Sequence, residues 1–278
     1  MLVIHDKSIS VYESALWRTT STVIETEEMI LIVDPNWLPE EIERIRIDVA
    51  GRPKELPRVL LFTHSDYDHV MGYGAFPEAQ VITSKAMAND TNRQTVIDAV
   101  LDWDDGYYID RPYDIRFPQA DWTPGWNETM NWGNTRLTFY PTRGHTADGL
   151  LTVVESPALS AGPVIVAGDY LSNVEFPYLY DSFTKYRETL DLFAAQIDRF
   201  APQMLIPGHG DLTTSEQEMH LRLMDSKWYL EQLERSVCGK TPFPEEALWK
   251  HYRFPRGMKA FHEANRKLLE KELEHGVE

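Results

Sequence analysis

Short apolar runs, bounded by Gly, Pro, Asn or Asp, recur along the first two thirds of the chain and are typical of buried strands. The runs that we expect to form strands are residues 21–26, 29–33, 58–62, 79–83, 135–140, 150–154, 163–167 and 204–206. Between several of them, apolar residues at helical spacing or capping residues predict helices. The segments that we expect to be helical are 39–50, 84–88, 92–101 and 182–200. This alternation predicts an α/β layer protein.

The chain from Thr214 onward differs, because its pattern predicts helices alone. Thr214 followed by Gln217 fits a capping box at the start of the first helix. The apolar positions that we expect this helix to turn inward are Leu221, Met224, Trp228 and Leu233. Residues 242–244, Pro-Phe-Pro, separate it from a second helix that we expect at 256–275.

Residues 89–133 interrupt the alternation of strands and helices. The segment holds four of the eight tryptophans, among prolines and aspartates. It is either an aromatic-cored excursion packed on the domain or a lid or pocket wall, because long irregular segments in compact domains are often functional. We therefore expect a core domain over 1–212 that includes this insertion, and a helical extension over 213–278 packed on the core.

Composition limits the location and the partners of the protein. A chain of 278 residues with 42% apolar and 26% charged residues is typical of a globular protein, and a net charge of −17 disfavours long nucleic acid as a partner. The single cysteine, Cys238, fits a reducing compartment, and we find neither a signal peptide nor an apolar run long enough to cross a membrane. We expect a cytoplasmic protein with a small-molecule substrate and no membrane partner, and we allow for a homodimer.

The densest group of chemically active side chains follows the apolar run 58–62, in the stretch Thr63-His64-Ser65-Asp66-Tyr67-Asp68-His69. Imidazole nitrogen and carboxylate oxygen are the usual donors to zinc, manganese and iron in proteins. A polar turn with two surface histidines is the alternative, but four donors directly after a strand favour a metal site.

Single donors follow other predicted strands, at Asp34, His145, Asp169 and His209, and in three cases a glycine stands beside the donor, where the backbone must turn tightly. Strand ends that meet at one edge of a sheet would bring these donors together. Besides Asp34, the loop and the strand ends supply seven donors, which are His64, Asp66, Asp68, His69, His145, Asp169 and His209. Seven donors are too many for one tetrahedral ion and suit two divalent ions with room for solvent.

Over residues 20–212 these patterns resemble the motifs of the metallo-β-lactamase superfamily of hydrolases. The matching elements, in the family's order, are Asp34, the loop His64–His69, Gly144-His145-Thr146, Gly168-Asp169 and Pro207-Gly208-His209-Gly210. The resemblance implies an αββα sandwich with a metal site at the edge between its sheets. The first metal would be held by His64, Asp66 and His145, and the second by Asp68, His69 and His209. Asp169 would bridge both metals.

Two positions depart from the family pattern. Asp66 stands where the signature usually has His, which gives His-x-Asp-x-Asp-His. We expect two divalent ions, zinc first, with manganese or iron as alternatives. A carboxylate makes the ligand set harder and more anionic, which shifts the preference towards manganese or iron compared with a site that has His here. Arg143 stands where a proline usually precedes Gly-His, so it either alters the loop or places a cation near the site for an anionic substrate.

The resemblance implies a hydrolase in which a hydroxide bridging two metal ions attacks an ester, thioester or lactone carbonyl. Asp68 is the residue on which we expect catalysis to depend. The residues beside the motifs that we expect to line the substrate pocket are Tyr67, Tyr170, Ser172, Asn173, Phe176 and Tyr178. Two alternatives stay open: a phosphodiesterase acting on a small phosphodiester, and a di-iron redox protein like the flavodiiron proteins, in which a carboxylate replaces the second histidine.

Overall fold

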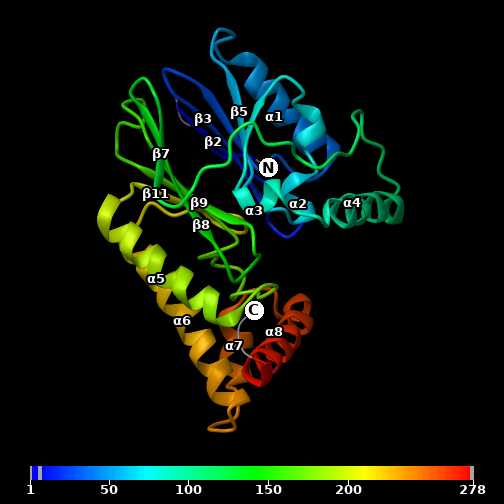
Figure 1. Ribbon diagram of the computed structural model, residues 1–278, viewed down its shortest axis with the longest axis vertical. Coiled ribbons are helices and arrows are strands. Elements are labelled where there is room, and N and C mark those ends of the chain that lie inside the picture. Colours follow the sequence, from blue (N-terminus) through cyan, green and yellow to red (C-terminus); the bar gives the residue numbers. More distant parts are fainter. Residues whose placement is uncertain (1, 6–7, 276–278) are drawn as a thin grey trace.

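The structure is a computed structural model that describes residues 2–5 and 8–275. Two β-sheets lie face to face, and helices cover their outer faces (Figure 1). The chain ends in α6 (Glu216–Val237), α7 (Glu245–His251) and α8 (Pro255–His275). The predicted αββα sandwich with a C-terminal helical region is confirmed. None of the helices in the described part of the chain is long and apolar enough to cross a membrane.

The first sheet uses the N-terminal strands in chain order. Its strands are β1 (Leu2–His5), β2 (Ile9–Glu13), β3 (Thr20–Glu25), β4 (Ile30–Val33), β5 (Arg58–Leu61) and β6 (Gln80–Ile82). Neighbours from β1 to β4 pair antiparallel, whereas β5 pairs in parallel with β4 and with β6. All four residues of β4 are buried, because the second sheet covers one face and α1 (Pro39–Gly51) the other. Burial on both faces explains the unbroken apolar runs in the sequence.

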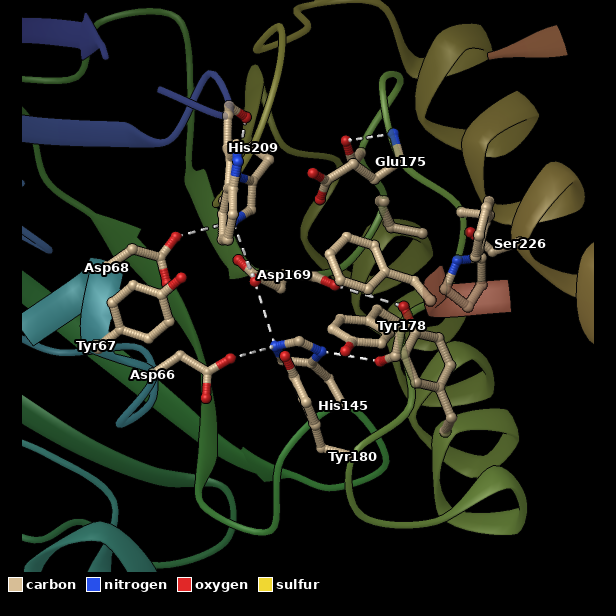
Figure 2. A pocket seen from close by; sticks show the side chains of 17 residues that line it. Asp66, Tyr67, Asp68, His145, Asp169, Glu175, Tyr178, Tyr180, His209 and Ser226 are labelled. Carbon is tan, nitrogen blue, oxygen red and sulfur yellow. Dashed lines mark hydrogen bonds and ion pairs between the residues drawn. The ribbon is translucent and has the colours of Figure 1, made fainter. Parts of the chain in front are cut away.

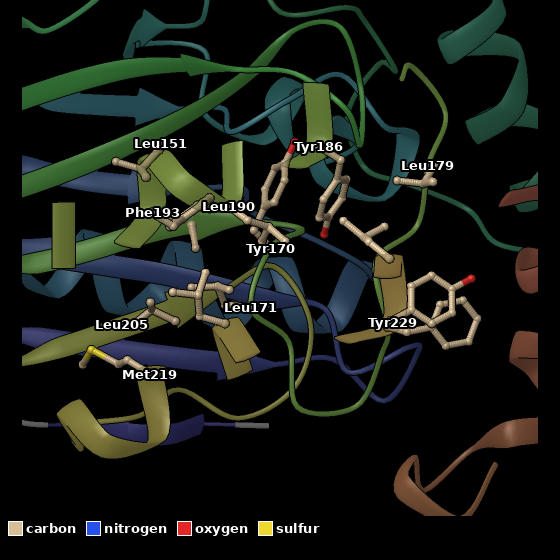
Figure 3. Packing of buried hydrophobic residues seen from close by; sticks show 14 of the residues in the cluster. Leu151, Tyr170, Leu171, Leu179, Tyr186, Leu190, Phe193, Leu205, Met219 and Tyr229 are labelled. Atoms are coloured by element: carbon tan, nitrogen blue, oxygen red, sulfur yellow. The ribbon is translucent and has the colours of Figure 1, made fainter. Parts of the chain in front are cut away.

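The second sheet is built from the later strands. In spatial order they are β11 (Met204–Pro207), β10 (Val164–Gly168), β9 (Gly149–Glu155), β8 (Thr135–Thr142) and β7 (Glu128–Trp132). β10 and β11 are parallel, and α5 (Phe183–Phe200) connects them. Ser182 caps α5 by accepting a hydrogen bond from the Lys185 amide, and the apolar face of α5 packs on the sheet and on α6 (Figure 3).

The segment 89–133 contains one long helix, α4 (Arg93–Tyr107), which extends beyond the predicted end at Leu101. Trp103 packs against Trp37, and Trp122 packs against the core between the sheets. The segment is therefore an excursion packed on the domain. No residue of 89–133 is among the described residues that line the cavity beside the candidate ligands, so the expectation of a pocket wall is not met there.

The predicted start of α6 was wrong, and its predicted inward face was right only in part. Ser215, not Thr214, caps the helix by accepting from the Glu218 amide. Leu221 and Met224 are 44% and 63% exposed. Of the other predicted residues, Leu233 is buried and Trp228 packs against the core. The buried face of α6 also includes Met219, Leu223, Ser226, Tyr229 and Leu230. The sequence pattern missed most of this face because it includes the polar Ser226 and the aromatic Tyr229, and it missed the short helix α7 altogether.

Candidate metal centre

The loop from Thr63 to Asp66 connects β5 to the short helix α2 (Tyr67–Val70). Asp66 occupies the N-cap position of α2, and Asp68 and His69 lie within the helix. The tight turn of this helix therefore brings the side chains of Asp66, Asp68 and His69 to one side of the candidate metal centre. The other donors reach this centre from the ends of strands β8, β10 and β11 (Figure 2).

The first group of donors consists of His64, Asp66 and His145. The Nε2 atom of His145 lies 3.4 Å from Asp66 Oδ2, and the Nε2 atom of His64 lies 3.7 Å from the same oxygen. Together with Asp169, one donor atom from each residue lies within 4.8 Å of all the others. A single cation among these atoms would contact nitrogen and oxygen donors from three separate parts of the chain.

The second group consists of Asp68, His69 and His209. The Nε2 atom of His209 lies 3.5 Å from Asp68 Oδ2, and the Nε2 atom of His69 lies 3.8 Å from that oxygen. These donor atoms also lie within 4.8 Å of one another. The composition of both groups is the one that the family resemblance implies.

Asp169 lies between the two groups. Its Oδ2 atom is 3.2 Å from the Nε2 atoms of both His145 and His209, and its Oδ1 atom is 3.2 Å from the Nε2 atom of His69. Gly208 makes this position available, because a Cβ atom at residue 208 would lie 2.0 Å from Asp169 Oδ1. The glycine beside His209 is thus explained by the close approach of the Asp169 carboxylate.

Outer hydrogen bonds orient the four imidazoles. The Nδ1–H group of His69 donates to Asp34 Oδ2 (3.0 Å). The Nδ1–H group of His64 donates to Thr63 Oγ1 (3.0 Å), and this hydroxyl donates to Asp34 (2.5 Å). His145 donates to the Tyr178 carbonyl (2.8 Å) and His209 to the Trp17 carbonyl (3.0 Å). A carboxylate or carbonyl partner accepts only, so the proton resides on Nδ1 and the Nε2 lone pairs face the centre.

The atoms at the centre fit bound cations. The Nε2 atoms of His64, His69 and His145 and the Oδ1 atom of Asp169 are buried and make no hydrogen bond. Buried polar atoms are almost always hydrogen-bonded in native proteins, so a group of unsatisfied lone pairs indicates a missing ligand. Imidazole and carboxylate donors suit a divalent transition metal.

The electrostatics of the centre also favour positive charge. Burial alone lowers the pKa of His69, but the carboxylates of Asp169 and Asp68 outweigh it and raise that pKa well above its ordinary value. At His209 burial again lowers the pKa, but the carboxylates of Asp169 and Glu175 outweigh it and raise the pKa to about 10. Burial raises the pKa of Asp169, yet the surrounding imidazoles hold it well below its ordinary range. The carboxylate is therefore ionised, as metal coordination requires.

A small cavity opens beside these donors and is lined by Tyr67 and Ser172, as the sequence predicts (Figure 2). Phe176 and Tyr178 also line it. Tyr170 and Asn173 lie elsewhere. The Tyr170 hydroxyl bonds the backbone of residues 143 and 145, which positions the loop that carries His145, and the Asn173 amide bonds Asp211.

Other cavity residues carry no motif in the sequence. They include Trp17, Glu175, Tyr180 and Phe261. The alternation Tyr178-Leu179-Tyr180 after Pro177 is a weak signal that could have indicated Tyr180. Burial raises the pKa of the Glu175 carboxyl, which lies in the cavity wall. Arg143 does not supply a cation there, because its guanidinium bonds the Asp181 carboxylate (2.7 Å) and also lies outside the cavity lining.

Comparison with known proteins identifies the family. The model of the metallo-beta-lactamase superfamily matches residues 15–209, so this chain belongs to the metallo-beta-lactamase superfamily. Among proteins with curated descriptions, no sequence matches the chain.

Solved structures share the fold at low sequence identity. A metallo-beta-lactamase from Pontibacter korlensis is 16% identical with a TM-score of 0.55, and the match covers 82% of this chain and 98% of that one. A metallo-beta-lactamase family protein from Thermus thermophilus is 16% identical with a TM-score of 0.60, covering 83% and 82%. An archaeal superfamily protein from Sulfolobus tokodaii is 16% identical with a TM-score of 0.54, covering 81% and 87%.

Proposed function

We propose that this protein is a dinuclear metallohydrolase that cleaves an ester, thioester or lactone. The observation that carries the proposal is the convergence of four imidazole Nε2 atoms and three carboxylates, with every Nδ1 atom engaged by an outer partner. His64, Asp66 and His145 would hold one divalent ion, and Asp68, His69 and His209 would hold the other. Asp169 would contact both.

Two bound cations would lower the pKa of a coordinated water, so that hydroxide is available near neutral pH. The chain itself supplies the remaining parts. The outer hydrogen bonds hold each imidazole in one tautomer and one orientation, so that no reorganisation is needed during the reaction. Tyr67, Tyr178 and Tyr180 line the cavity, where a phenol hydroxyl can donate a hydrogen bond to the oxygen that gains negative charge.

The cavity lining favours a carbonyl substrate over a phosphodiester. Neither Lys nor Arg is among the described residues that line the cavity, and the Glu175 carboxylate contributes to its wall. A phosphodiester carries a negative charge into the site, and phosphate sites in proteins commonly use Arg or Lys. An ester, thioester or lactone enters without charge.

Zinc is the metal that we propose first for the centre. Three aspartates among the candidate ligands shift the preference towards manganese or iron relative to a site with His at position 66. Metal analysis of protein purified without added metal tests this. A content of two zinc ions per chain, with neither manganese nor iron, would contradict the shift and leave the site itself intact.

A paired activity screen tests the function. Chromogenic carboxylic esters, lactones, thioesters and bis-aryl phosphodiesters are compared with zinc, manganese or iron added. We expect hydrolysis of at least one carbonyl class by the native protein and none by Asp68→Ala, with circular dichroism as the check that the variant folds. Equal hydrolysis by Asp68→Ala would overturn the assignment, and cleavage of the phosphodiesters alone would replace it with the alternative function.

A further inference from the structure

The cavity beside the candidate ligands is too small for a whole substrate. Its volume is about 40 Å³. Pockets that enclose a drug-sized ligand have volumes of about 300–1,000 Å³. The cavity therefore has room for the reacting group, and the rest of a substrate must extend beyond it.

A second cavity, which we call the tail groove, adjoins the first and has a volume of about 480 Å³. It lies between the loop Ala15–Arg18 and the first turns of α8. Trp17, Glu175 and Phe261 line both cavities. These shared wall residues place the two cavities next to each other, so a substrate with its reacting group at the candidate ligands can extend its remaining part towards the tail groove.

The walls of the tail groove are mainly apolar. Trp17 is 45% exposed and Phe254 is 49% exposed, and Met258 and Val174 also line the groove. Large apolar side chains that remain open to solvent gain free energy when a ligand covers them. The tail groove therefore suits an alkyl chain or an aromatic ring.

The charged groups around the tail groove favour a ligand without negative charge. Arg18 is the cationic residue in its lining, and its guanidinium bonds both Glu13 (2.6 Å) and Asp211 (2.5 Å). Glu175 lies where the two cavities meet, and its carboxylate has no ion pair among the described residues. A carboxylate at the junction and a neutralised guanidinium favour a ligand without negative charge.

We propose that the tail groove binds an uncharged apolar tail of the substrate, so that the enzyme prefers esters, thioesters or lactones that carry an extended alkyl or aryl group. The nature of the scissile bond rests on the proposed function, whereas the nature of the tail rests on the groove itself. Phe254, Phe261 and Trp17 are then specificity-determining residues, and none of them is a candidate metal ligand.

Gly257 provides a way to fill the tail groove without disturbing the fold. It lines the groove on the first turn of α8, and a Cβ atom there would meet no atom within 4 Å. Gly257→Phe therefore places a ring in the groove and replaces a glycine in a helix, where glycine is unfavourable. Gly51→Phe is the matched control, because Gly51 ends α1, has equally open space and does not line the groove.

The first experiment measures binding without catalysis. The probe is N-phenyl-1-naphthylamine, an uncharged dye whose fluorescence rises in apolar sites, with 1-octanol as competitor. We expect the native protein and Gly51→Phe to bind it equally and Gly257→Phe to bind it at least about tenfold more weakly, because the contact area for one ring is lost. Equal binding by all three proteins would overturn the proposal.

The second experiment measures hydrolysis of 4-nitrophenyl acetate, butyrate and octanoate. We expect kcat/KM to rise at least about tenfold from acetate to octanoate in the native protein and in Gly51→Phe, since each buried methylene adds a several-fold gain. The rise should disappear in Gly257→Phe. The same rise in all three proteins would overturn the proposal.

Two further outcomes separate the competing explanations. If no ester is cleaved but Gly257→Phe still weakens dye binding, the proposed ester hydrolysis is wrong, whereas the apolar ligand site is supported. If sedimentation shows that the native protein is a dimer and that Gly257→Phe dissociates it, the groove belongs to a second copy of the chain and the proposal is overturned.

Discussion

The two groups of candidate ligands differ in their exposure to solvent. The side chain of Asp66 in the first group is 28% exposed, whereas that of Asp68 in the second group is 5% exposed. Their histidines are alike, because the side chains of His64, His145 and His209 are at most 4% exposed. The difference between the groups therefore lies in the carboxylate, and the carboxylate of the first group is the more open to solvent.

The outer hydrogen bonds of the two groups are parallel. In each group one histidine connects to Asp34, His69 directly and His64 through the Thr63 hydroxyl. The other histidine in each group donates to a backbone carbonyl. The outer hydrogen bonds thus support the histidines of both groups in the same way, and the groups differ in the exposure of their carboxylates. Substitutions can therefore be chosen that affect one group or both.

Asp169→Ala should have the largest effect, because Asp169 lies against histidines of both groups. We expect loss of metal from both groups and a fall in kcat/KM well above the roughly 10- to 100-fold that loss of an outer partner costs. Metal content and hydrolysis are measured together, with Asp191→Ala on the exposed face of α5 as the control. Retention of one full metal equivalent would show that Asp169 serves one group only.

Asp34→Asn should weaken both groups at once. Asn tolerates the left-handed backbone of this residue (φ 43°) and keeps an oxygen for the Thr63 amide, but its NH2 group cannot accept from His69 or from the Thr63 hydroxyl. We expect about 10- to 100-fold lower metal affinity at each group. Competition with a chromogenic chelator measures the binding of the first and of the second metal ion. Weaker binding of one ion alone would contradict the shared role of Asp34.

Thr63→Val should weaken the first group only. Valine keeps the shape of threonine and the amide bond to Asp34, but it leaves His64 Nδ1 without its acceptor. We expect about tenfold weaker binding in the first group, at the lower end of the effects of outer partners, and an unchanged second group. Equal weakening of both binding steps in the same chelator competition would show that the two groups are not independent.

Asp66→His should have the smallest effect on metal content and should change metal choice instead. Histidine restores the usual residue of the family motif and removes one negative charge, so we expect a several-fold shift in preference towards zinc over manganese. Dialysis against equimolar zinc and manganese followed by elemental analysis gives the ratio. An unchanged ratio would indicate that position 66 does not contact the metal.

Local patterns in the sequence were sufficient to predict strands β3 to β6 and β8 to β11 and the strand-end positions of the donors, but not β1, β2 and β7. The sandwich was implied by the family resemblance. Four donors in one short stretch after a strand identify half of the centre, and Gly beside His145, Asp169 and His209 identifies the other half. The structure brings all seven together. These features depend on short segments, which sequence patterns describe well.

Features that depend on contacts distant in sequence could not be predicted. Trp17 enters the cavity wall because its carbonyl accepts from His209, and Phe261 enters it because α8 folds back on the core. Tyr170 stands beside a motif, yet its hydroxyl is turned to the backbone near His145. Proximity to a motif in the sequence therefore predicts the metal donors better than it predicts the other residues that line the cavity.

The metal content of the native protein and of one variant from each group tests the central claim most directly. The proteins are loaded with excess zinc or manganese, dialysed and measured by elemental analysis against protein concentration. We expect two ions per chain in the native protein and one in each of His145→Ala and His209→Ala. A single ion in the native protein, or two ions in either variant, would contradict a centre built from two separate ligand groups.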